Sequence, residues 1–348
     1  MNRMRSDHPL LVVVNPHARS SRLNPKIHNR LSKVLSSAGK VELTPSLEAL
    51  DTLMARQAQS DFQAENRANG TKVPSGSLCF HGGDGSVSRG ITSYVRHYRK
   101  LAGQDPKILP PILVVRAGTF NMLCNRLGVS GSVLTSVKQW RDGKKSKIET
   151  VPTVRVTVDG FEPTYGFVFG WGIGFRVLRN YYSVRAYPSV LDGSVIAAKT
   201  IFSGLRPDAS DQPLFRGEDT GIKVNGDYVL PQVSVRAIVA GTIERLCLGL
   251  RPMPLKTPAL GAFHVAATGL PLWKLALLSP SFLWGYFREN SNRPFDDSYL
   301  GADVQKLDFH GTEGFTVDGE VFTFDGARRI LIEPGPTAQF WVDNSSLV

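Results

Sequence analysis

Apolar residues in the first 130 or so positions form short continuous runs that alternate with longer segments of helical spacing. The run from Leu10 to Val14 has no polar position, as expected for a parallel strand buried on both faces. Segment 23–38 instead places Ile27, Leu31 and Leu35 on one side of a helix. Strands are expected at 9–15, 41–44, 77–80 and 112–115, and helices at 23–38, from 46, from 87 and from 121. This alternation predicts an N-terminal, doubly wound α/β domain with ligand loops at the carboxyl ends of its strands.

Beyond residue 147 the pattern changes to a period of two. Val154, Val156 and Val158 are apolar at every second position, and Asp159-Gly160 provides a hairpin turn. Further strands are expected at 164–169, 221–224, 228–230, 233–240, 262–266, 304–309, 316–317, 330–332 and 339–342, and helices at 194–205 and 272–287. The basic segment 141–147 marks the boundary, so we predict an α/β domain over 1–147 and a mainly antiparallel, β-sandwich-like domain over 148–348.

The sequence Gly82-Gly83-Asp84-Gly85-Ser86 stands between an expected strand and an expected helix. Glycines allow the backbone to turn sharply and to approach a ligand. The helix that follows presents N–H groups and the positive end of its dipole to a phosphate. The carboxylate of Asp84 suits Mg²⁺ or a hydroxyl better than a bare phosphate. Gly-Asp-Gly alone would be a β-turn, but in this setting it indicates a nucleotide site, with His81 packed at the strand end.

Length and charge add two constraints. The 348 residues, 42% of them hydrophobic, suffice for two domains with sizeable cores. The formal net charge of +11 favours an anionic partner: a nucleotide, a nucleic acid or an anionic membrane surface. No zinc-finger or RNP signature supports nucleic-acid binding. The three cysteines, odd in number and widely spaced, indicate reduced thiols in a cytosolic protein, and no zinc-ligand spacing is present.

Five motifs follow one another along the chain: Asn15-Pro16, Gly82 to Ser86, Ala117-Gly118-Thr119 with Asn121, Gly172-Ile173-Gly174-Phe175, and Asp318-Gly319-Glu320. Together they resemble the diacylglycerol kinase catalytic-domain family, which includes bacterial lipid kinases, sphingosine kinases and ceramide kinases. The family pattern is NP, then GGDG with Thr or Ser, then P-x-GT-x-N, then a C-terminal β domain with DGE. The likeness covers nearly the whole chain. NAD kinases share the glycine loop but are less similar around Asn15-Pro16 and 118–127.

The resemblance implies an ATP site between the two domains, and ATP phosphoryl transfer normally requires Mg²⁺. Asn15 and Thr44 would stand at the ends of the first two strands, and Thr119 would close the pocket. The phosphates would be held by Gly82, Gly83, Asp84, Gly85 and Ser86. Asp318 and Glu320 would be presented by the β domain. In such kinases the DGE acid is the candidate base for the lipid hydroxyl, and the GGDG acid, here Asp84, is proposed as base or metal organiser.

The sequence departs from the family pattern at four places. No carboxylate follows the glycine loop in Ser88-Arg89-Gly90, and Met122 stands where many relatives have Asp. Arg116-Ala117 replaces the usual Pro before Gly-Thr. Ala259-Leu260-Gly261 replaces an Asp-Gly associated with a structural Mg²⁺ in some bacterial relatives, so the metal ligands stay unknown. The absent carboxylates favour a sphingoid base or ceramide over diacylglycerol as acceptor.

Phosphoryl transfer requires N–H donors, Mg²⁺, basic side chains and an acid near the acceptor hydroxyl. Asp318 and Glu320, two residues apart, would share one face of an extended strand, so that one contacts the metal and the other the hydroxyl. The alternative is a hairpin turn at Asp318-Gly319, which spacing alone favours. Arg116 and Arg89 are candidates to contact phosphate, with a solvated or salt-bridged arginine as the alternative.

Segment 272–287 is apolar nearly all round, but Lys274 and Pro280 interrupt it, and it is short for a membrane span. We expect a packed helix, with an aromatic face in the bilayer interface as the alternative. Lys144, Lys145 and Lys147 could hold an anionic membrane surface, or could belong to a charged loop without a partner.

The sequence thus predicts a cytoplasmic, peripherally membrane-associated lipid kinase that uses ATP and Mg²⁺. Its expected partners are a lipid substrate and a membrane surface, without nucleic acid, and a homodimer stays open. Two alternatives remain: an NAD kinase-like enzyme with a soluble acceptor, and a degenerate, non-catalytic protein that binds a nucleotide or a lipid.

Overall fold

A computed structural model describes residues 9–68, 76–184, 189–206, 208–209, 212–229, 234–244, 246, 250–253, 261–284 and 299–343. The chain forms two compact units. The first unit comprises Met1–Pro152 together with Gly335–Val348, and the second unit comprises Thr153–Pro334. Cys247, Ala259 and Leu260 lie outside the described residues, as do positions 230, 233 and 285–287 of the expected elements.

A parallel sheet forms the centre of the first unit, in the order β2-β1-β3-β4-β18. Its strands are β1 (Leu10–Val14), β2 (Gly39–Leu43), β3 (Ser77–His81), β4 (Ile108–Leu113) and the last part of β18 (Arg328–Asp343). β1 and β3 are the apolar runs of the sequence, and they lie inside the sheet, where both of their faces are covered.

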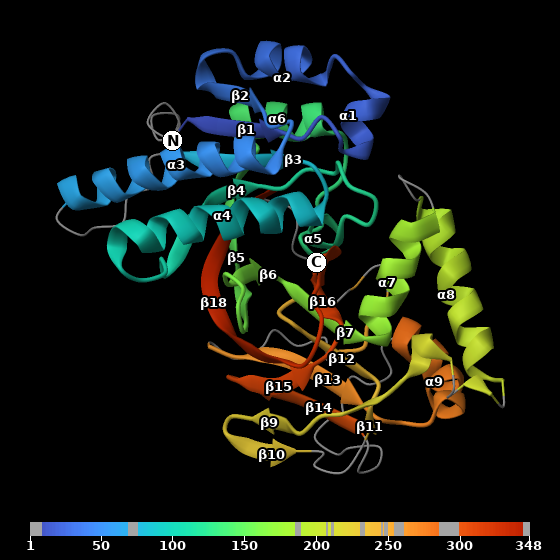
Figure 1. Ribbon diagram of the computed structural model, residues 1–348. Helices are drawn as coiled ribbons and strands as arrows, with labels where there is room; N and C mark the ends of the chain where they lie inside the picture. The colour runs from blue at the N-terminus through green and yellow to red at the C-terminus, as the bar shows by residue number, and fades with distance from the viewer. Residues whose placement is uncertain are drawn as a thin grey trace. The chain divides into compact units, whose positions relative to one another are not determined.

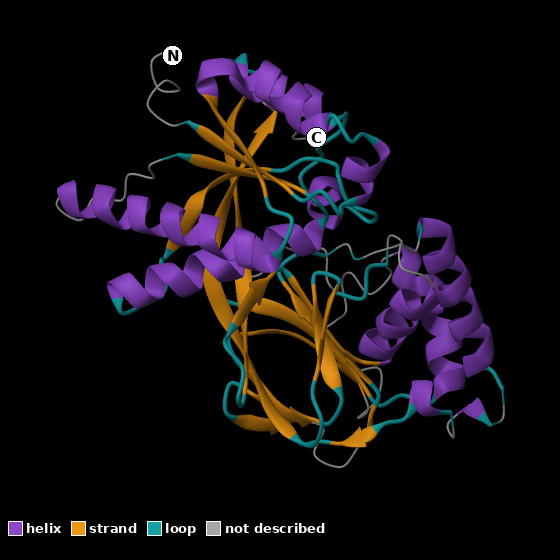
Figure 2. Cartoon of the chain, turned by 45° about the horizontal axis from the view of Figure 1, so that its top comes forward, coloured by secondary structure: helices purple, strands orange, loops and turns teal. Residues whose placement is uncertain are grey.

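Helices cover both faces of this sheet (Figure 1 and Figure 2). Val12 and Cys79 pack with α2 and α6 on one face. On the other face the ring of Phe80 lies so close to Gly90 that a Cβ there would meet it at 2.1 Å, which brings α4 onto the sheet. The helices are α1 (Arg19–Leu23), α2 (Ile27–Leu35), α3 (Leu47–Arg67), α4 (Asp84–Ala102), α5 (Met122–Arg126) and α6 (Val133–Arg141).

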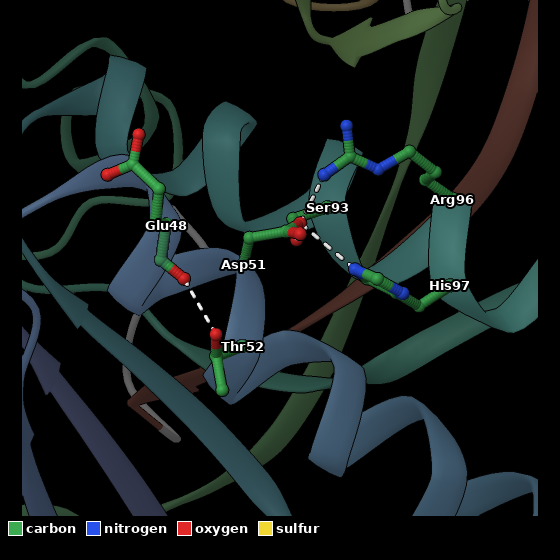
Figure 3. A network of polar contacts seen from close by, with 6 residues as sticks. All are labelled: Glu48, Asp51, Thr52, Ser93, Arg96 and His97. Atoms are coloured by element: carbon green, nitrogen blue, oxygen red, sulfur yellow. Dashed lines mark hydrogen bonds and ion pairs between the residues drawn. The ribbon is translucent and has the colours of Figure 1, made fainter.

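A carboxylate on α3 fastens this helix to its neighbour α4 (Figure 3). Asp51 accepts a hydrogen bond from the Ser93 hydroxyl at 2.5 Å, lies 3.0 Å from His97 Nε2, and pairs with Arg96. Partial burial acts to raise the pKa of Asp51, but the bonds from Ser93, His97 and Arg96 outweigh it and lower that pKa. This network lies away from the glycine loop and serves helix packing.

Two sheets share one core in the second unit. The antiparallel sheet runs β14-β13-β12-β7-β16-β17, and β5, β6, β9, β10, β15 and the first part of β18 form the other layer. Phe169, Trp171 and Phe315 from the antiparallel sheet pack against Phe309 and Ile330 from the other layer. The strands are β5 (Lys145–Val158), β6 (Thr164–Gly166), β7 (Val168–Gly172), β8 (Glu218–Asp219), β9 (Ile222–Val224), β10 (Asp227–Val229), β11 (Ser234–Val235), β12 (Ala237–Gly241), β13 (Phe263–Thr268), β14 (Tyr299–Val304), β15 (Leu307–Gly311), β16 (Gly314–Val317) and β17 (Glu320–Thr323).

Three helices belong to the second unit: α7 (Ile173–Val184), α8 (Val190–Gly204) and α9 (Leu272–Trp284). α7 packs on the antiparallel sheet, and α8 packs against α7 and α9 (Figure 1). No helix within the described residues has the length and apolar character needed to cross a bilayer. The predicted fold class, an α/β domain followed by a mainly antiparallel β domain, is confirmed.

The limits of the units differ from the predicted boundary at residue 147. β5 begins at Lys145 and continues to Val158, so the basic segment 141–147 leads into a strand rather than a linker. Lys145 is fully buried and pairs with Asp343 at 3.1 Å, so it is not available to a membrane surface. The expected strands 330–332 and 339–342 are one strand, β18, whose last residues return to the first unit.

Other local predictions need smaller corrections. The expected strand 304–309 is two strands, β14 and β15, and 233–240 is divided between β11 and β12. The dipeptide Asp325-Gly326 is of a type that is common in hairpin turns, but it does not form a tight hairpin here, because β17 and β18 belong to different sheets. Cys79 and Cys124 are buried free thiols, and burial raises the pKa of Cys124 to about 12.

Candidate functional site

The glycine loop is shorter than the sequence suggested. β3 ends at His81 and α4 already begins at Asp84, so the loop between them consists of Gly82 and Gly83. Ser86 N donates to Gly83 O at 2.9 Å and closes the first turn. A Cβ on Gly82 would lie 2.0 Å from Ser86 Oγ, so a side chain there would displace the helix start. The loop therefore directs the amino end of a 19-residue helix toward the carboxyl edge of the sheet.

A second loop, 116–121, lies directly against the first. An added Cβ on Gly118 would be 2.5 Å from Gly83 Cα, so the two backbones touch where neither has a side chain. Asn121 closes this loop by accepting from Gly118 N and donating to Gly118 O, both at 3.1 Å. Asn121 has a φ of 51°, a left-handed conformation that asparagine tolerates better than most residues. Thr119 is half-buried in the same loop.

Asp84 joins the two loops. Its carboxylate accepts hydrogen bonds from Met122 N at 2.8 Å and from Leu123 N at 3.1 Å, which are the first N–H groups of α5. Burial raises the pKa of Asp84, and these two N–H groups act against that shift. The carboxylate thus holds α5 against the glycine loop. Met122, which departs from the family pattern, contributes through its backbone.

Asn15 and Thr44 stand at neighbouring strand ends, as predicted. Asn15 N donates to His81 O at 3.1 Å, and its side-chain oxygen accepts from His17 N at 2.9 Å. The buried Thr44 hydroxyl donates to Val14 O at 3.3 Å. Both side chains order the backbone at the carboxyl edge, beside the glycine loop.

His81 has two serine partners that the sequence did not reveal. Its Nε2 lies 3.1 Å from Ser20 Oγ, and its Nδ1 lies 3.1 Å from Ser21 Oγ. Ser21 Oγ donates to Asn15 O at 2.6 Å, so we assign the proton between Ser21 and His81 to Nδ1. The fully buried ring therefore links α1 to the start of the glycine loop. The serines lie about 60 residues before His81, and no local pattern marks them.

Arg116, the first residue of the second loop, bonds to residues that follow this loop. Its Nε donates to Val129 O at 2.8 Å, and its guanidinium also bonds Asn125. This arginine has structural partners, and its charge acts to lower the pKa of Asp84.

The acidic motif Asp318-Gly319-Glu320 lies in the second unit and is a hairpin turn between β16 and β17. Asp318 has a φ of 48° and Gly319 a φ of 90°, so the expected extended strand with both acids on one face is wrong. The Asp318 side chain is nearly buried, and it accepts from Phe167 N at 2.9 Å and from Val168 N at 2.8 Å. Asp318 thereby fixes the link between β6 and β7, and Glu320 is more exposed.

The predicted residues therefore fall into two groups. The first unit holds Asn15, Thr44, Gly82, Gly83, Asp84, Gly85, Ser86 and Thr119, and the second unit holds Asp318 and Glu320. Among the described residues, no cluster of three or more histidine, cysteine, aspartate or glutamate side chains could hold a metal ion.

Comparison with known proteins shows what the region that holds the first group is similar to. Residues 9–153 match the family model of the diacylglycerol kinase catalytic domain. The predicted resemblance is confirmed. This diacylglycerol kinase match spans the glycine loop, the Gly118 loop and all of their partners described above, and ends where the second unit begins. No curated protein has a matching sequence.

Solved structures extend the likeness in fold over both units. A chain described as a proposed diacylglycerol kinase from Bacillus anthracis str. Sterne is 14% identical, with a TM-score of 0.65. The match covers 98% of this chain and 99% of that chain. A second diacylglycerol kinase structure from the same organism is 13% identical, covers 98% of each chain and has a TM-score of 0.57. The diacylglycerol kinase fold thus includes the β-rich second unit.

Proposed function

We propose that this protein is an ATP-dependent lipid kinase, which transfers the γ-phosphate to a lipid hydroxyl at a membrane surface. The observation that carries the proposal is the glycine loop, where Gly82-Gly83 joins a buried parallel strand to the amino end of α4. Backbone N–H groups and the positive dipole end of a helix attract phosphate. The diacylglycerol kinase match over this region supports a lipid as the acceptor.

The backbone N–H groups of the glycine loop and of the start of α4 suit a nucleotide phosphate. The Asp84 carboxylate would repel phosphate if it pointed at the ligand, but it is bonded to two N–H groups of α5. The backbone of Gly82 and Gly83 and of the first turn of α4 would hold the phosphates, with Asn15, Thr44 and Thr119 around them. When bound, ATP would supply the phosphoryl group and Mg²⁺ would neutralise the charge on it.

The acidic hairpin turn would act on the acceptor. Of its two acids, we propose Glu320 as the group that accepts the hydroxyl proton, because it is more exposed than Asp318. Asp318 would position the turn through its bonds to Phe167 N and Val168 N. On the absence of the usual carboxylates we place a sphingoid base or ceramide ahead of diacylglycerol as acceptor.

A lipid panel tests the proposal. Purified protein receives Mg²⁺-ATP and mixed micelles of diacylglycerol, ceramide, sphingosine or monoacylglycerol, with NAD as the soluble acceptor, and phosphorylated products are measured. We expect transfer to one lipid class. Glu320→Gln should lower kcat by about 10²- to 10⁴-fold with an unchanged ATP affinity. The matched control is Glu162→Gln, an exposed glutamate in the β5–β6 loop, which should keep wild-type kcat.

Two results would contradict the proposal. Phosphorylation of NAD without any phosphorylated lipid would assign a soluble acceptor. ATP binding without transfer to any acceptor would show that the chain is a non-catalytic relative.

A further inference from the structure

The outer helices of the second unit expose large apolar side chains. On α8, Leu191 is 77% exposed and Phe202 is 71% exposed, and Val195 lies between them on the same side of the helix. On α9, Trp273 is 54% exposed and Leu277 is 64% exposed, one turn apart. We call these five residues the α8–α9 face. Single exposed leucines are ordinary on protein surfaces, but a run of them with a phenylalanine and a tryptophan on adjacent helices is not.

The arrangement of α8 does not bury this face inside its own unit. α8 packs against α7 and α9 rather than lying on the sheet, and no helix or strand of the described residues lies over its outer side (Figure 1 and Figure 2). Ser189 and Asp192 form a capping box that fixes the start of the helix, with Asp192 accepting from Ser189 N and Oγ. The exposed stripe therefore belongs to an ordered helix and not to a frayed end.

The charge around the face is positive. α8 and α9 contain one acidic residue between them, Asp192, and the capping box engages its carboxylate. Lys199 is exposed on α8, and Arg206 and Asp208, both exposed, follow the end of the helix. On α9 the Lys274 nitrogen lies 5.8 Å from the centre of the Trp273 ring. Tryptophan and lysine side chains on an apolar helix suit the headgroup region of an anionic bilayer.

We propose that the α8–α9 face docks this protein onto the surface of an anionic phospholipid bilayer. Leu191, Val195, Phe202, Trp273 and Leu277 enter the boundary between headgroups and acyl chains, and Lys199, Arg206 and Lys274 contact the phosphate groups. This inference deepens the proposed function and rests on it, because docking would give the lipid kinase access to an acceptor that resides in the membrane.

The docking face is joined to the acidic hairpin turn by two tyrosines of α7. The Tyr182 hydroxyl donates to Gly319 O at 3.0 Å, in the turn that carries Asp318 and Glu320. The Tyr181 hydroxyl donates to Ser189 O, the residue that caps α8, at 3.3 Å. A bilayer held by α8 would therefore be in fixed relation to the proposed proton acceptor within one unit. These two hydrogen bonds connect the α8–α9 face to the turn that carries the proposed proton acceptor, Glu320.

Vesicle sedimentation without ATP tests the docking face. The full chain is mixed with vesicles of phosphatidylcholine, alone or with phosphatidylglycerol. We expect Leu191→Gln/Phe202→Gln to lower partitioning onto the anionic vesicles by about 10-fold or more, because both side chains lose the gain of leaving water. Lys199→Gln/Lys274→Gln should reduce the preference for anionic vesicles by about fivefold per charge. The matched control is Leu23→Gln/Leu47→Gln, which changes leucines of the first unit that are 77% and 59% exposed.

Three results would overturn the inference. The first is wild-type vesicle binding by Leu191→Gln/Phe202→Gln with an unchanged circular dichroism spectrum. The second is an equal loss of binding in the Leu23→Gln/Leu47→Gln control. The third is a dimer of the wild-type chain without vesicles that becomes a monomer in Leu191→Gln/Phe202→Gln, which would assign the face to a second copy of the chain.

The kinase proposal and the docking proposal fail separately. A lipid with short acyl chains, dissolved as monomers, needs no bilayer, so Leu191→Gln/Phe202→Gln should phosphorylate it at the wild-type rate while losing activity on vesicle-borne lipid. Loss of vesicle binding in a protein that phosphorylates no lipid would support the docking face and contradict the kinase function.

Discussion

At the scale of single residues, buried side chains hold the loops of the candidate site in place through hydrogen bonds. His81, held by Ser20 and Ser21, has no exposed surface and directly precedes the glycine loop. Asp84 holds α5 through two backbone N–H groups. The sequence predicted a packed His81 but not its two serine partners. For Asp84 it suggested chemistry rather than support, because a carboxylate among glycines suits Mg²⁺ or a hydroxyl.

His81 should make stability depend on pH. Burial lowers its pKa to about 4, from an ordinary value near 6.5. Between about pH 6.5 and pH 4, the His81 side chain binds a proton in the unfolded chain but not in the folded protein. The free energy of unfolding therefore falls as the pH falls through this window. The loss should total about 3 kcal/mol. We expect urea unfolding at pH 7 and pH 4.5 to show a smaller difference for His81→Gln than for the wild type. Equal differences would contradict the role of this histidine.

Asp84→Asn should weaken the join between the two loops. Asparagine keeps one acceptor oxygen but presents an NH₂ group to a backbone N–H that the carboxylate now satisfies, which costs about 1–3 kcal/mol. We expect a lower free energy of unfolding and an ATP affinity about 10-fold weaker, measured by urea unfolding and by calorimetric titration. The control is Asp142→Asn, an exposed partner of Arg141, which should change stability by less than about 1 kcal/mol.

At the scale of elements, the sequence predicted those parts that local pattern decides. The apolar runs predicted β1 and β3, and Ser46 was the correct start signal for α3, where it caps Ala49 N. Elements set by distant contacts were missed. β14 and β15 separate at Gln305-Lys306 because both N–H groups donate to Asn225 Oδ1, 80 positions earlier in the chain. β18 continues through two prolines, which locally indicate a break, with an irregular register after Thr337.

The candidate site shows the same division. The glycine loop and the strand-end residues Asn15 and Thr44 were predictable, because parallel strands bring their carboxyl ends to one edge. The turn at Asp318 was one of two alternatives, and the decision between them rests on Phe167 and Val168, about 150 residues away.

The contact between the two glycine loops is the element on which nucleotide binding should depend. Gly118→Ala would place a Cβ 2.5 Å from Gly83 Cα and force the loops apart. We expect ATP affinity to fall by about 10-fold or more and kcat to fall with it. Gly174→Ala is the matched control, since a Cβ there meets no atom within 4 Å and the change should leave ATP affinity intact. Equal ATP affinity in both variants would show that the loop contact has no part in binding.

At the scale of the whole molecule, β5 leaves the first unit and β18 returns to it. Lys145 at the start of β5 pairs with Asp343 at the end of β18. Because Lys145 is fully buried, Asp343→Asn would break its ion pair inside the protein and should cost about 3 kcal/mol. Urea unfolding measures this cost, and Arg329→Gln, which breaks a more exposed pair with Asp308, should change the free energy of unfolding much less. If Asp343→Asn lowers the free energy of unfolding as little as Arg329→Gln does, the stabilising role of the Lys145–Asp343 pair is contradicted.

The most direct test of the account is the transfer of radiolabelled γ-phosphate from ATP into the organic extract of a lipid reaction by the purified chain. The account predicts a labelled lipid monophosphate that requires Mg²⁺, falls about 10-fold or more in Gly118→Ala, and stays at the wild-type level in Gly174→Ala. An organic extract without label, while ATP binds to the protein, would contradict the central claim that this molecule is a lipid kinase.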